Sequence, residues 1–300
     1  MLLLPKNVKI IGQGITGSEG SRALPWILSY GTQVVAGVTP GKGGQKLNNI
    51  PIFDSIIDAT NNINDIEGVV QFVPPQFAKK ATIEAIDSGI KFILIGAEKV
   101  PTQDAAYIYR YAKDNGASIV GPNSVGIINP KRKLKLGLIG GGKPEKMFIP
   151  GDIAVISKSG SVAAEISLLL KNAGLGVSWA IGIGGDRIIG SDFGDFLLEI
   201  EKDDSTKASV IFGELGGTYE ERVALLIKEK KIKKPVVAYV AGEFTMSLPS
   251  DVQFGHAGAI IEGNRGLPQI KREILKEAGV IVADNLDDIP SLIKDILSKK

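Results

Sequence analysis

The sequence predicts an α/β protein of two domains, each built on a parallel sheet that helices cover on both faces. The chain has 300 residues, which exceeds the length of one typical domain. Short β-branched runs alternate with helical segments, and these runs are apolar throughout, as in strands that are buried on both faces. Many of the 37 glycines fall just after the apolar runs, where strands of such sheets turn into helices.

The first series of apolar runs predicts a domain over residues 1–130, a common domain length. Helix-like segments such as Ala78–Gly89 separate these runs. The predicted strands are Val8–Ile11, Gln33–Ala36, Gly68–Phe72, Lys91–Ile95 and Ser118–Val120.

Residues 131–150 are expected to link the two domains. They include the basic run Lys131–Lys133 and the turn-rich segment Gly140–Pro144, without a sustained apolar period. A second series of strands then predicts a domain over residues 151–300. Its strands are Ile153–Ile156, Val177–Ile181, Ser209–Phe212, Val236–Val240 and Val280–Ala283. Within it, Thr218–Glu221 has the hydroxyl-plus-Glu spacing of a capping box at a helix start.

Composition excludes several classes of function. A net charge of +2 is too balanced for a nucleic-acid or membrane-surface binder. The count of cysteines is zero, which removes disulfide frameworks, thiol nucleophiles and cysteine metal sites. The single histidine nearly removes histidine metal clusters. No apolar run approaches the roughly 18 residues of a membrane span, and Met1–Pro5 lacks the basic start of a secretory signal. We therefore expect a cytoplasmic protein without a metal site.

A glycine-rich turn after the first predicted strand indicates a nucleotide site. Gly12, Gly14 and Gly17 satisfy the GxGxxG pattern between a strand and a helix. Such glycines allow a tight turn and close backbone approach, and the helix start offers free N–H groups to a phosphate. The match is weak by itself, because a glycine-rich turn can be purely structural.

The end of the second predicted strand argues against NAD. An NAD site would place an acidic residue there to bind the ribose hydroxyls. This sequence has Val38–Gly44 instead, with Lys42 among glycines. A lysine at this edge suits a phosphate, so the ligand is expected to carry an extra phosphate near its ribose. Coenzyme A fits this description, and NADP is the competing interpretation.

Four loops of the second domain should meet at one edge of its sheet, because ligands bind beyond the carboxyl ends of parallel strands. Each loop combines small residues with a polar or charged side chain. The loops are Ser157–Ser161, Gly182–Arg187, Gly213–Gly217 and Gly242–Gly255, the last of which leads to His256.

His256 is the candidate nucleophile of this edge. A neutral imidazole can accept a phosphoryl group on one ring nitrogen while a partner holds the other. Glu214, at a neighbouring strand end, is the expected carboxylate partner. The alternative is a structural histidine that packs or caps, but the glycines around His256 leave it little packing.

The sequence resembles the α subunit of succinyl-CoA synthetase and its relatives, the nucleotide-dependent acyl-CoA ligases. The matching motifs run in family order over nearly the whole chain. They are Gln13–Ser18, Gly37–Gly44, Glu84–Ile90, Ile119–Asn123, Ser157–Gly160, Gly182–Asp186, Gly213–Gly217 and Gly255–Ile261. The resemblance implies an N-terminal Rossmann-like CoA-binding domain followed by a flavodoxin-like parallel-sheet ligase domain.

The resemblance also implies roles for residues at matching positions. His256 matches the phosphohistidine, and Glu214 matches its carboxylate partner. Ser159, Gly160 and Ser161 match the helix-start turn that faces the phosphoryl group. The positions implied to bind CoA, with its phosphates at the first five, are Thr16, Gly17, Ser18, Glu19, Lys42, Gly96, Ala97 and Glu98. The family's β subunit carries an ATP-grasp domain that binds ATP and Mg²⁺, so a separate partner of that kind is implied.

Two departures from the succinate-specific pattern bear on the acid substrate. Ser161–Ala164 places Ala164 where those members have a substrate-facing tyrosine, which would enlarge the acid pocket. Ser250–Phe254 replaces a basic stretch before the histidine. The segment Val252–Gly258, together with Asp186–Arg187 and Thr245–Met246, looks more like citryl-CoA synthetase and the synthetase-like part of ATP-citrate lyase.

The expected protein is therefore the α subunit of an ADP-forming acyl-CoA synthetase, joining CoA to succinate or citrate through an acyl phosphate and a phosphohistidine. A citryl-CoA synthetase or ATP-citrate lyase type of subunit is the alternative within the same chemistry. A CoA- or nucleotide-binding regulator without chemistry, and an NADP oxidoreductase, are the alternatives of other classes.

Overall fold

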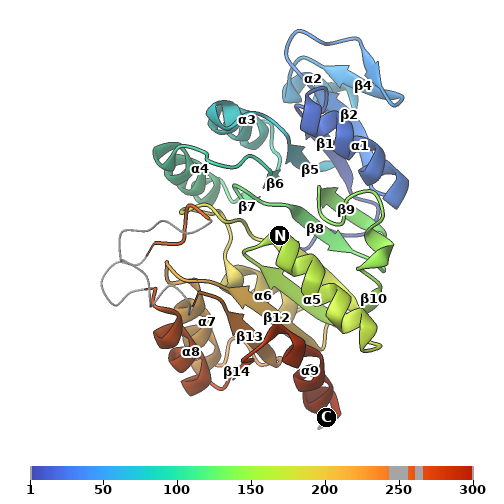
Figure 1. Ribbon diagram of the computed structural model, residues 1–300. Coiled ribbons are helices and arrows are strands. Elements are labelled where there is room, and N and C mark those ends of the chain that lie inside the picture. The colour runs from blue at the N-terminus through green and yellow to red at the C-terminus, as the bar shows by residue number, and fades with distance from the viewer. Residues whose placement is uncertain (1, 243–255, 261–265, 299–300) are drawn as a thin grey trace.

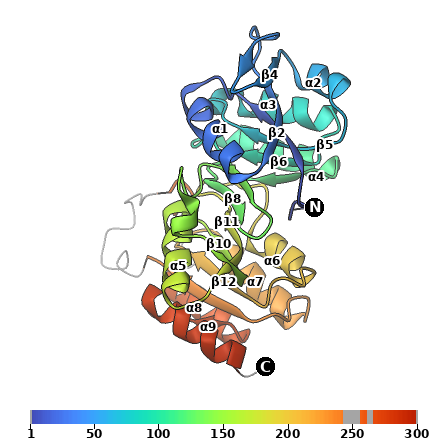
Figure 2. The same cartoon turned by 90° about the vertical axis from the view of Figure 1, so that its right-hand side faces the viewer.

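The computed structural model describes residues 2–242, 256–260 and 266–298 of the chain. It shows the N-terminal domain stacked on the C-terminal domain (Figures 1 and 2). Among the described residues, every helix is too short or too polar to cross a membrane.

The first domain is a seven-stranded sheet in the order β3-β4-β2-β1-β5-β6-β7. The six strands other than β3 are parallel, and along the chain their order is 3-2-1-4-5-6, that of a doubly wound Rossmann domain. The strands are β1 (Lys9–Gln13), β2 (Gln33–Val38), β3 (Lys46–Leu47), β4 (Ile50–Phe53), β5 (Ile66–Gln71), β6 (Phe92–Ile95) and β7 (Ser118–Val120).

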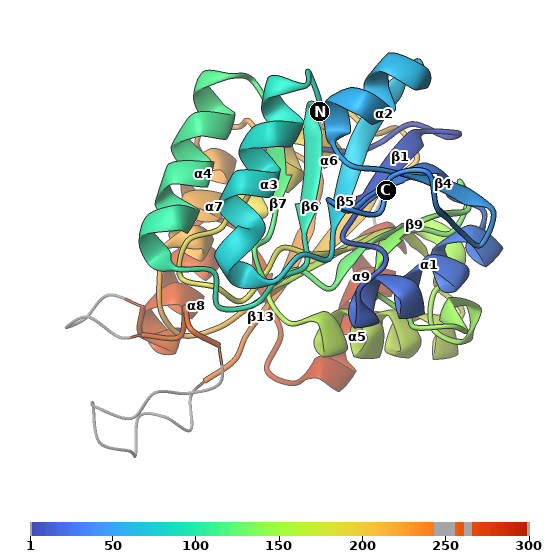
Figure 3. The ribbon, with the colours of Figure 1, turned by 90° about the horizontal axis from the view of Figure 1, so that it is seen from above.

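Helices α2 (Ile56–Asn62), α3 (Pro75–Asp87) and α4 (Thr102–Asp114) pack on one face of this sheet in a common apolar core. Helix α1 (Ser18–Tyr30) lies on the opposite face, as the view from above shows (Figure 3). The rest of that face is covered by the second domain. One apolar core runs from β1, β5 and β6 into the strands of the second sheet, so the two domains share buried surface.

The second domain is also a seven-stranded sheet, in the order β14-β13-β12-β10-β11-β8-β9. Its five parallel strands follow the chain order 2-1-3-4-5 from the β11 side, which is the flavodoxin order. The strands are β8 (Gly126–Asn129), β9 (Leu134–Gly137), β10 (Pro150–Ser157), β11 (Val177–Gly182), β12 (Ala208–Gly213), β13 (Val236–Val240) and β14 (Ile281–Val282).

Helices cover both faces of the second sheet. Helices α5 (Gly160–Asn172) and α9 (Ile289–Ser298) pack on one face, and α6 (Phe193–Glu201), α7 (Tyr219–Lys228) and α8 (Pro268–Glu277) pack on the other. Figure 2 shows α5 on one side of the strands and α6 and α7 on the other. Short 3₁₀ turns, η1 (Pro144–Lys146) and η3 (Leu286–Asp288), complete the described elements. The predicted fold class is confirmed in both domains.

The second sheet is mixed, whereas the sequence predicted a parallel one. Strands β8 and β9 form an antiparallel hairpin that joins the sheet beside β11. Gly126 faces Gly137 across this hairpin, and a Cβ at Gly126 would lie 1.9 Å from the carbonyl oxygen of Leu136. The hairpin lies at 126–137, so the segment expected as linker begins inside the second sheet. Charged residues such as buried Lys135 interrupt the apolar pattern there and hide β9 in the sequence.

The predicted capping box at Thr218–Glu221 is wrong. The Thr218 side chain makes no capping hydrogen bond. Glu221, the acidic residue of the pattern, and its neighbour Glu220 turn instead toward α8, where the buried ammonium group of Lys271 contacts Glu220 and lies 3.3 Å from Glu221 Oε2. Tertiary ion pairing therefore replaces the local cap. A capping box does occur at α6, between Asp192 and Asp195.

Candidate active site

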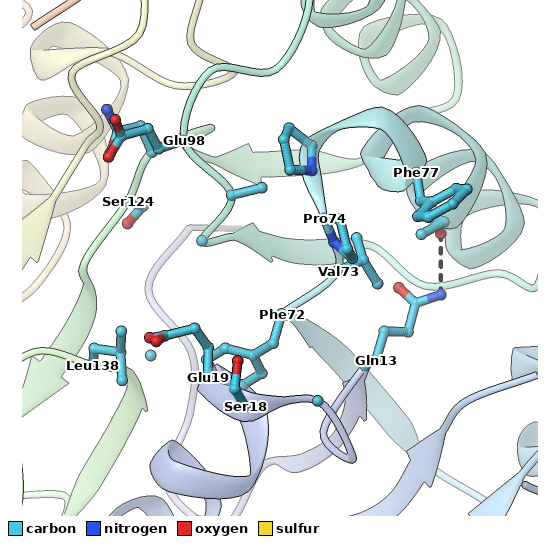
Figure 4. A pocket seen from close by; sticks show the side chains of 18 of the residues that line it. Gln13, Ser18, Glu19, Phe72, Val73, Pro74, Phe77, Glu98, Ser124 and Leu138 are labelled. Atoms are coloured by element: carbon cyan, nitrogen blue, oxygen red, sulfur yellow. Dashed lines mark hydrogen bonds between the residues drawn. The ribbon is translucent and has the colours of Figure 1, made fainter.

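A cavity of about 1130 Å³ lies between the two domains, at the carboxyl ends of the strands of the first sheet and the start of α5. Figure 4 shows side chains from separate segments around it. Of the residues predicted for the sites, all except Glu214 line this one cavity. They are Thr16, Gly17, Ser18, Glu19, Lys42, Gly96, Ala97, Glu98, Ser159, Gly160, Ser161 and His256. The fold thus brings both predicted half-sites into one space.

The glycine-rich turn after β1 forms one wall. Gly14 has a φ of +73°, and a Cβ there would lie 3.0 Å from the carbonyl oxygen of Phe72. Helix α1 begins at Ser18, and its N-cap, Gly17, has no side chain to satisfy the first N–H groups. These groups are available to an anion. The carboxylate of Glu19 lies 2.6 Å from Arg22, so Glu19 can serve a phosphate only through its backbone.

Lys42 stands on a loop whose shape depends on Asp54, a residue that the sequence analysis did not single out. Asp54 Oδ1 accepts hydrogen bonds from the N–H groups of Gly41 (2.7 Å) and Gly43 (3.0 Å). A Cβ at Gly43 would lie 2.4 Å from Asp54 Oδ2, so a larger residue there would displace this carboxylate. In the sequence, the only indication of this role of Asp54 was an acidic residue at the end of a short strand.

The segment Gly96–Glu98 follows β6 and lines the cavity. The Gly96 N–H donates to the carbonyl of Gln71 (3.2 Å), and the Asn123 N–H donates to the carbonyl of Ala97 (2.7 Å). Figure 4 shows Glu98 and Ser124 on the same side of the cavity, across from Ser18 and Glu19. Backbone bonds to the end of β5 and to the loop after β7 therefore fix this segment.

At the second-domain end of the cavity, His256 meets Glu214 as predicted from the strand ends. The distance from His256 Nδ1 to Glu214 Oε2 is 2.8 Å, and the side chains are 31% and 13% exposed. A carboxylate accepts the Nδ1–H of the neutral ring, so the lone pair lies on Nε2. The geometry therefore holds the ring in the tautomer whose Nε2 can attack phosphorus.

Lys158 forms a buried ion pair with Glu214 that the sequence did not predict. Its Nζ lies 3.2 Å from Glu214 Oε1, and its side chain is 2% exposed. Burial raises the pKa of Glu214, but the His256 hydrogen bond and the charge of Lys158 outweigh burial and lower the pKa below its usual value. The hydrogen bond that His256 donates to Glu214 raises the pKa of His256 above 6.5, although burial acts in the opposite direction. Glu214 is therefore ionised and favours a positively charged or N–H-donating ring.

Gly185 provides the surface against which the imidazole rests. A Cβ at this position would lie 2.4 Å from His256 Cδ2 and 3.0 Å from Nε2. Beyond the ring, the Gly258 N–H donates to the carbonyl of Gly185 at 3.1 Å. The glycines of the 182–187 loop thus allow the histidine segment to lie directly on the end of β11.

The Ser157–Ser161 turn places the start of α5 at the same cavity. Ser157 Oγ accepts from the Ser159 N–H (3.1 Å) and donates to the Ser159 carbonyl (2.6 Å). The Ser159 hydroxyl does not cap the helix and lies 3.1 Å from Ser161 Oγ. The first turn of α5 is thereby left open to an anion near His256.

The residues expected to select the acid are only partly described. Ala164 lies on α5, partly buried against the apolar core, and it is not among the residues that line the cavity. Segments 245–246 and 250–254, and the loop 243–255 that precedes His256, lie outside the described residues.

Comparisons with known proteins agree with this arrangement. A CoA-binding domain model matches residues 5–99, and a CoA-ligase model matches residues 156–283. The α 2 subunit of the ADP-forming succinate–CoA ligase of Archaeoglobus fulgidus is 42% identical over 99% of both chains. A subunit of the ADP-forming sulfoacetate-CoA ligase of an Acholeplasma species is 39% identical over 98% of both. The malate–CoA ligase α subunit of Methylorubrum extorquens is 36% identical over 99% of both.

The solved ATP citrate lyase of Methanosaeta concilii, in complex with (3S)-citryl-CoA, has a similar fold. It superposes with a TM-score of 0.91 at 27% identity over 99% of this chain, which spans 51% of the lyase chain. The family models, the full-length relatives and the fold all point to one assignment. The chain belongs to the CoA-ligase family, among the α subunits of the ADP-forming acid–CoA ligases.

Proposed function

We propose that this chain is the catalytic α subunit of an acid–CoA ligase in which His256 carries a phosphoryl group from ATP to a carboxylic acid. The observation that supports it most strongly is the 2.8 Å contact between Glu214 and His256 Nδ1, at a cavity shared with the starts of α1 and α5. A histidine whose Nδ1 is held in this way keeps a nucleophilic lone pair on Nε2.

The reaction would proceed in three steps. His256 Nε2 attacks the γ-phosphorus of ATP, and the bond to the bridging oxygen breaks to release ADP. A carboxylate oxygen of the acid attacks the phosphorus of the phosphohistidine, and the N–P bond breaks to give an acyl phosphate. The CoA thiolate attacks the acyl carbon, and inorganic phosphate leaves with the C–O electrons.

The residues of this chain would contribute positioning and charge, which dominate phosphoryl transfer. Glu214 stabilises the positive ring of the phosphohistidine, and Lys158 holds Glu214 ionised. The backbone N–H groups of Ser159, Gly160 and Ser161 would face the phosphoryl oxygens, assisted by the helix dipole. Thr16, Gly17, Ser18, the backbone of Glu19, and Lys42 would bind the phosphates of CoA. Gly96, Ala97 and Glu98 would line its path toward His256.

The proposal includes a partner. An ATP-grasp β subunit would bind ATP and Mg²⁺ and present the γ-phosphate to His256, giving a heterodimer or heterotetramer in the cytoplasm. The acid would be a di- or tricarboxylate. Succinate is favoured by the name of the 42% identical relative, and citrate by the ligand of the structural neighbour. Relatives at 36–39% identity are named for malate and sulfoacetate, so the acid has to be measured.

Thioester formation by the complex with its partner tests this function. The purified complex receives ATP, Mg²⁺, CoA and one of succinate, citrate or malate, and loss of free thiol is compared with release of ADP. We expect acid-dependent thiol loss with one ADP for each thioester, and none with His256→Asn. Binding of CoA without thiol loss or protein labelling from γ-labelled ATP would favour a CoA-binding regulator instead.

A further inference from the structure

Asp186 connects the CoA-lining segment of the first domain to the loop that supports His256 in the second. It is 4% exposed. Its Oδ1 accepts the Lys99 N–H at 3.4 Å, and its Oδ2 accepts the Val100 N–H at 3.3 Å. The side-chain amide of Asn123 also acts on this carboxylate and lowers its pKa, against the effect of burial. Three groups of the N-terminal half thus converge on one side chain of the second domain.

Two of these three residues have a left-handed backbone. Lys99 has a φ of 61° and Asn123 a φ of 58°. This conformation is uncommon for a residue with a side chain like that of lysine, and it persists where surrounding contacts enforce it. The Asn123 N–H also donates to the carbonyl of Ala97 at 2.7 Å. Asp186 and Asn123 therefore enforce the conformation of the segment 96–100, which lines the cavity through Gly96, Ala97 and Glu98.

On its other side, Asp186 directly follows Gly185, on which the His256 ring rests. The carbonyl of Gly185 accepts the Gly258 N–H at 3.1 Å, and a Cβ at Gly258 would lie 3.0 Å from the carbonyl oxygen of Asp186. A displacement of Asp186 therefore changes the surface beneath the imidazole. In the other direction, a displacement of the histidine segment acts on Asp186 and on segment 96–100.

We propose that Asp186 is a positioning residue that couples CoA binding at segment 96–100 to the phosphorylation equilibrium of His256. This inference rests on the proposed function, because it assumes that His256 is phosphorylated and that CoA occupies the first-domain cavity. Coupling between two sites is reciprocal at equilibrium. CoA would change the ratio of phosphorylated to free enzyme by the same factor by which phosphorylation changes the affinity for CoA.

The test uses the complex with its partner and desulfo-CoA, which binds as CoA does but has no thiol to react. Phosphorylation of the chain is measured at fixed ratios of ATP to ADP, with and without saturating desulfo-CoA. For the wild type we expect a change of at least about fivefold in the phosphorylation equilibrium. For Asp186→Asn, in which an NH₂ group faces backbone N–H donors, we expect a change of less than twofold.

Asp203→Asn is the matched control. Asp203 also accepts several hydrogen bonds, from Trp179 Nε1 and Ser205, but in a part of the second domain that does not line the cavity. It should retain the wild-type coupling.

Asn123→Gly is a milder variant, because glycine tolerates the positive φ and keeps the backbone N–H while the side-chain donor is lost. Its coupling should fall between the wild type and Asp186→Asn.

Hydrogen exchange gives a measurement that does not require phosphorylation. Desulfo-CoA should slow exchange at the Gly258 amide in the wild type and leave it unchanged in Asp186→Asn. A wild type that is never phosphorylated would refute the proposed function, while this exchange result would still test Asp186. Wild-type coupling in Asp186→Asn, or a wild type in which desulfo-CoA affects neither measurement, would overturn the inference.

Discussion

Replacing Gly185 by alanine should slow phosphoryl transfer by about 100-fold while leaving the fold intact. The added Cβ would lie 2.4 Å from His256 Cδ2 and 2.6 Å from Cγ, whereas ordinary contact begins at 3.4 Å. The ring must therefore move by roughly 1 Å, given the rigidity of the strand end beneath it. The backbone of Gly185 lies outside the left-handed region, so the alanine backbone is not strained and the effect is steric.

A shift of this size acts on the 2.8 Å contact between His256 Nδ1 and Glu214. An increase of 1 Å takes the contact beyond hydrogen-bond distance, and a misplacement of about 1 Å can cost about 100-fold in rate. We expect Gly185→Ala to lower the initial rate of His256 labelling from γ-labelled ATP by about that factor. Gly116→Ala is the control, because Gly116 has open space around it at the end of α4.

The control should lose about 1 kcal/mol of stability, since Gly116 has a φ of +64°, without any loss of labelling. CoA affinity, measured by calorimetry, should stay within about twofold of the wild type in the control, as Gly116 does not line the cavity. Labelling of Gly185→Ala at the wild-type rate would refute the steric role that the structure gives to this glycine.

The remaining predictions concern charge. Because the Nε2 lone pair is available only on the neutral ring, labelling should increase as the pH rises through the His256 pKa, with a midpoint above 6.5. Glu214→Gln should move that midpoint downward in a pH–rate profile, and an unchanged midpoint would contradict the pairing. Lys42→Ala should raise the KM for CoA about tenfold without changing labelling, and a weaker dependence of KM on salt would accompany it. Lys271→Met should cost about 3–5 kcal/mol in urea unfolding, because it leaves buried Glu220 without its cation, and a loss below 1 kcal/mol would argue against that ion pair.

Most of what could be predicted from the sequence came from the strand ends and from the glycines that follow them. The apolar runs locate ten of the strands, and their alternation with helices predicts two doubly wound sheets. The expectation that His256 meets Glu214 follows from the same rule, because both residues lie beyond carboxyl ends of strands in one sheet. The structure adds that both predicted half-sites share one cavity.

Contacts that depend on tertiary packing were not predictable in this way. The ion pair of Lys158 with Glu214 requires the register of β10 beside β12. The contact of the His256 ring with Gly185 requires the histidine segment to lie against the loop that follows β11. The Asp54 contacts require β4 to lie beside β2. The β8–β9 hairpin has too few apolar residues to show a clear strand pattern. Glu221 pairs with the buried Lys271 and does not cap its own helix. Local patterns identify elements and strand ends, whereas partners from distant segments appear only once the sheets are assembled.

The position of the phosphoryl group on the protein tests the central claim most directly. The complex with its partner is incubated with γ-labelled ATP, and the labelled chain is analysed by ³¹P NMR and by mass spectrometry of its peptides. We predict an acid-labile, base-stable phosphate on Nε2 of His256, because Glu214 holds Nδ1. A phosphate on Nδ1, or on any other residue of the chain, would contradict the geometry from which the mechanism was built.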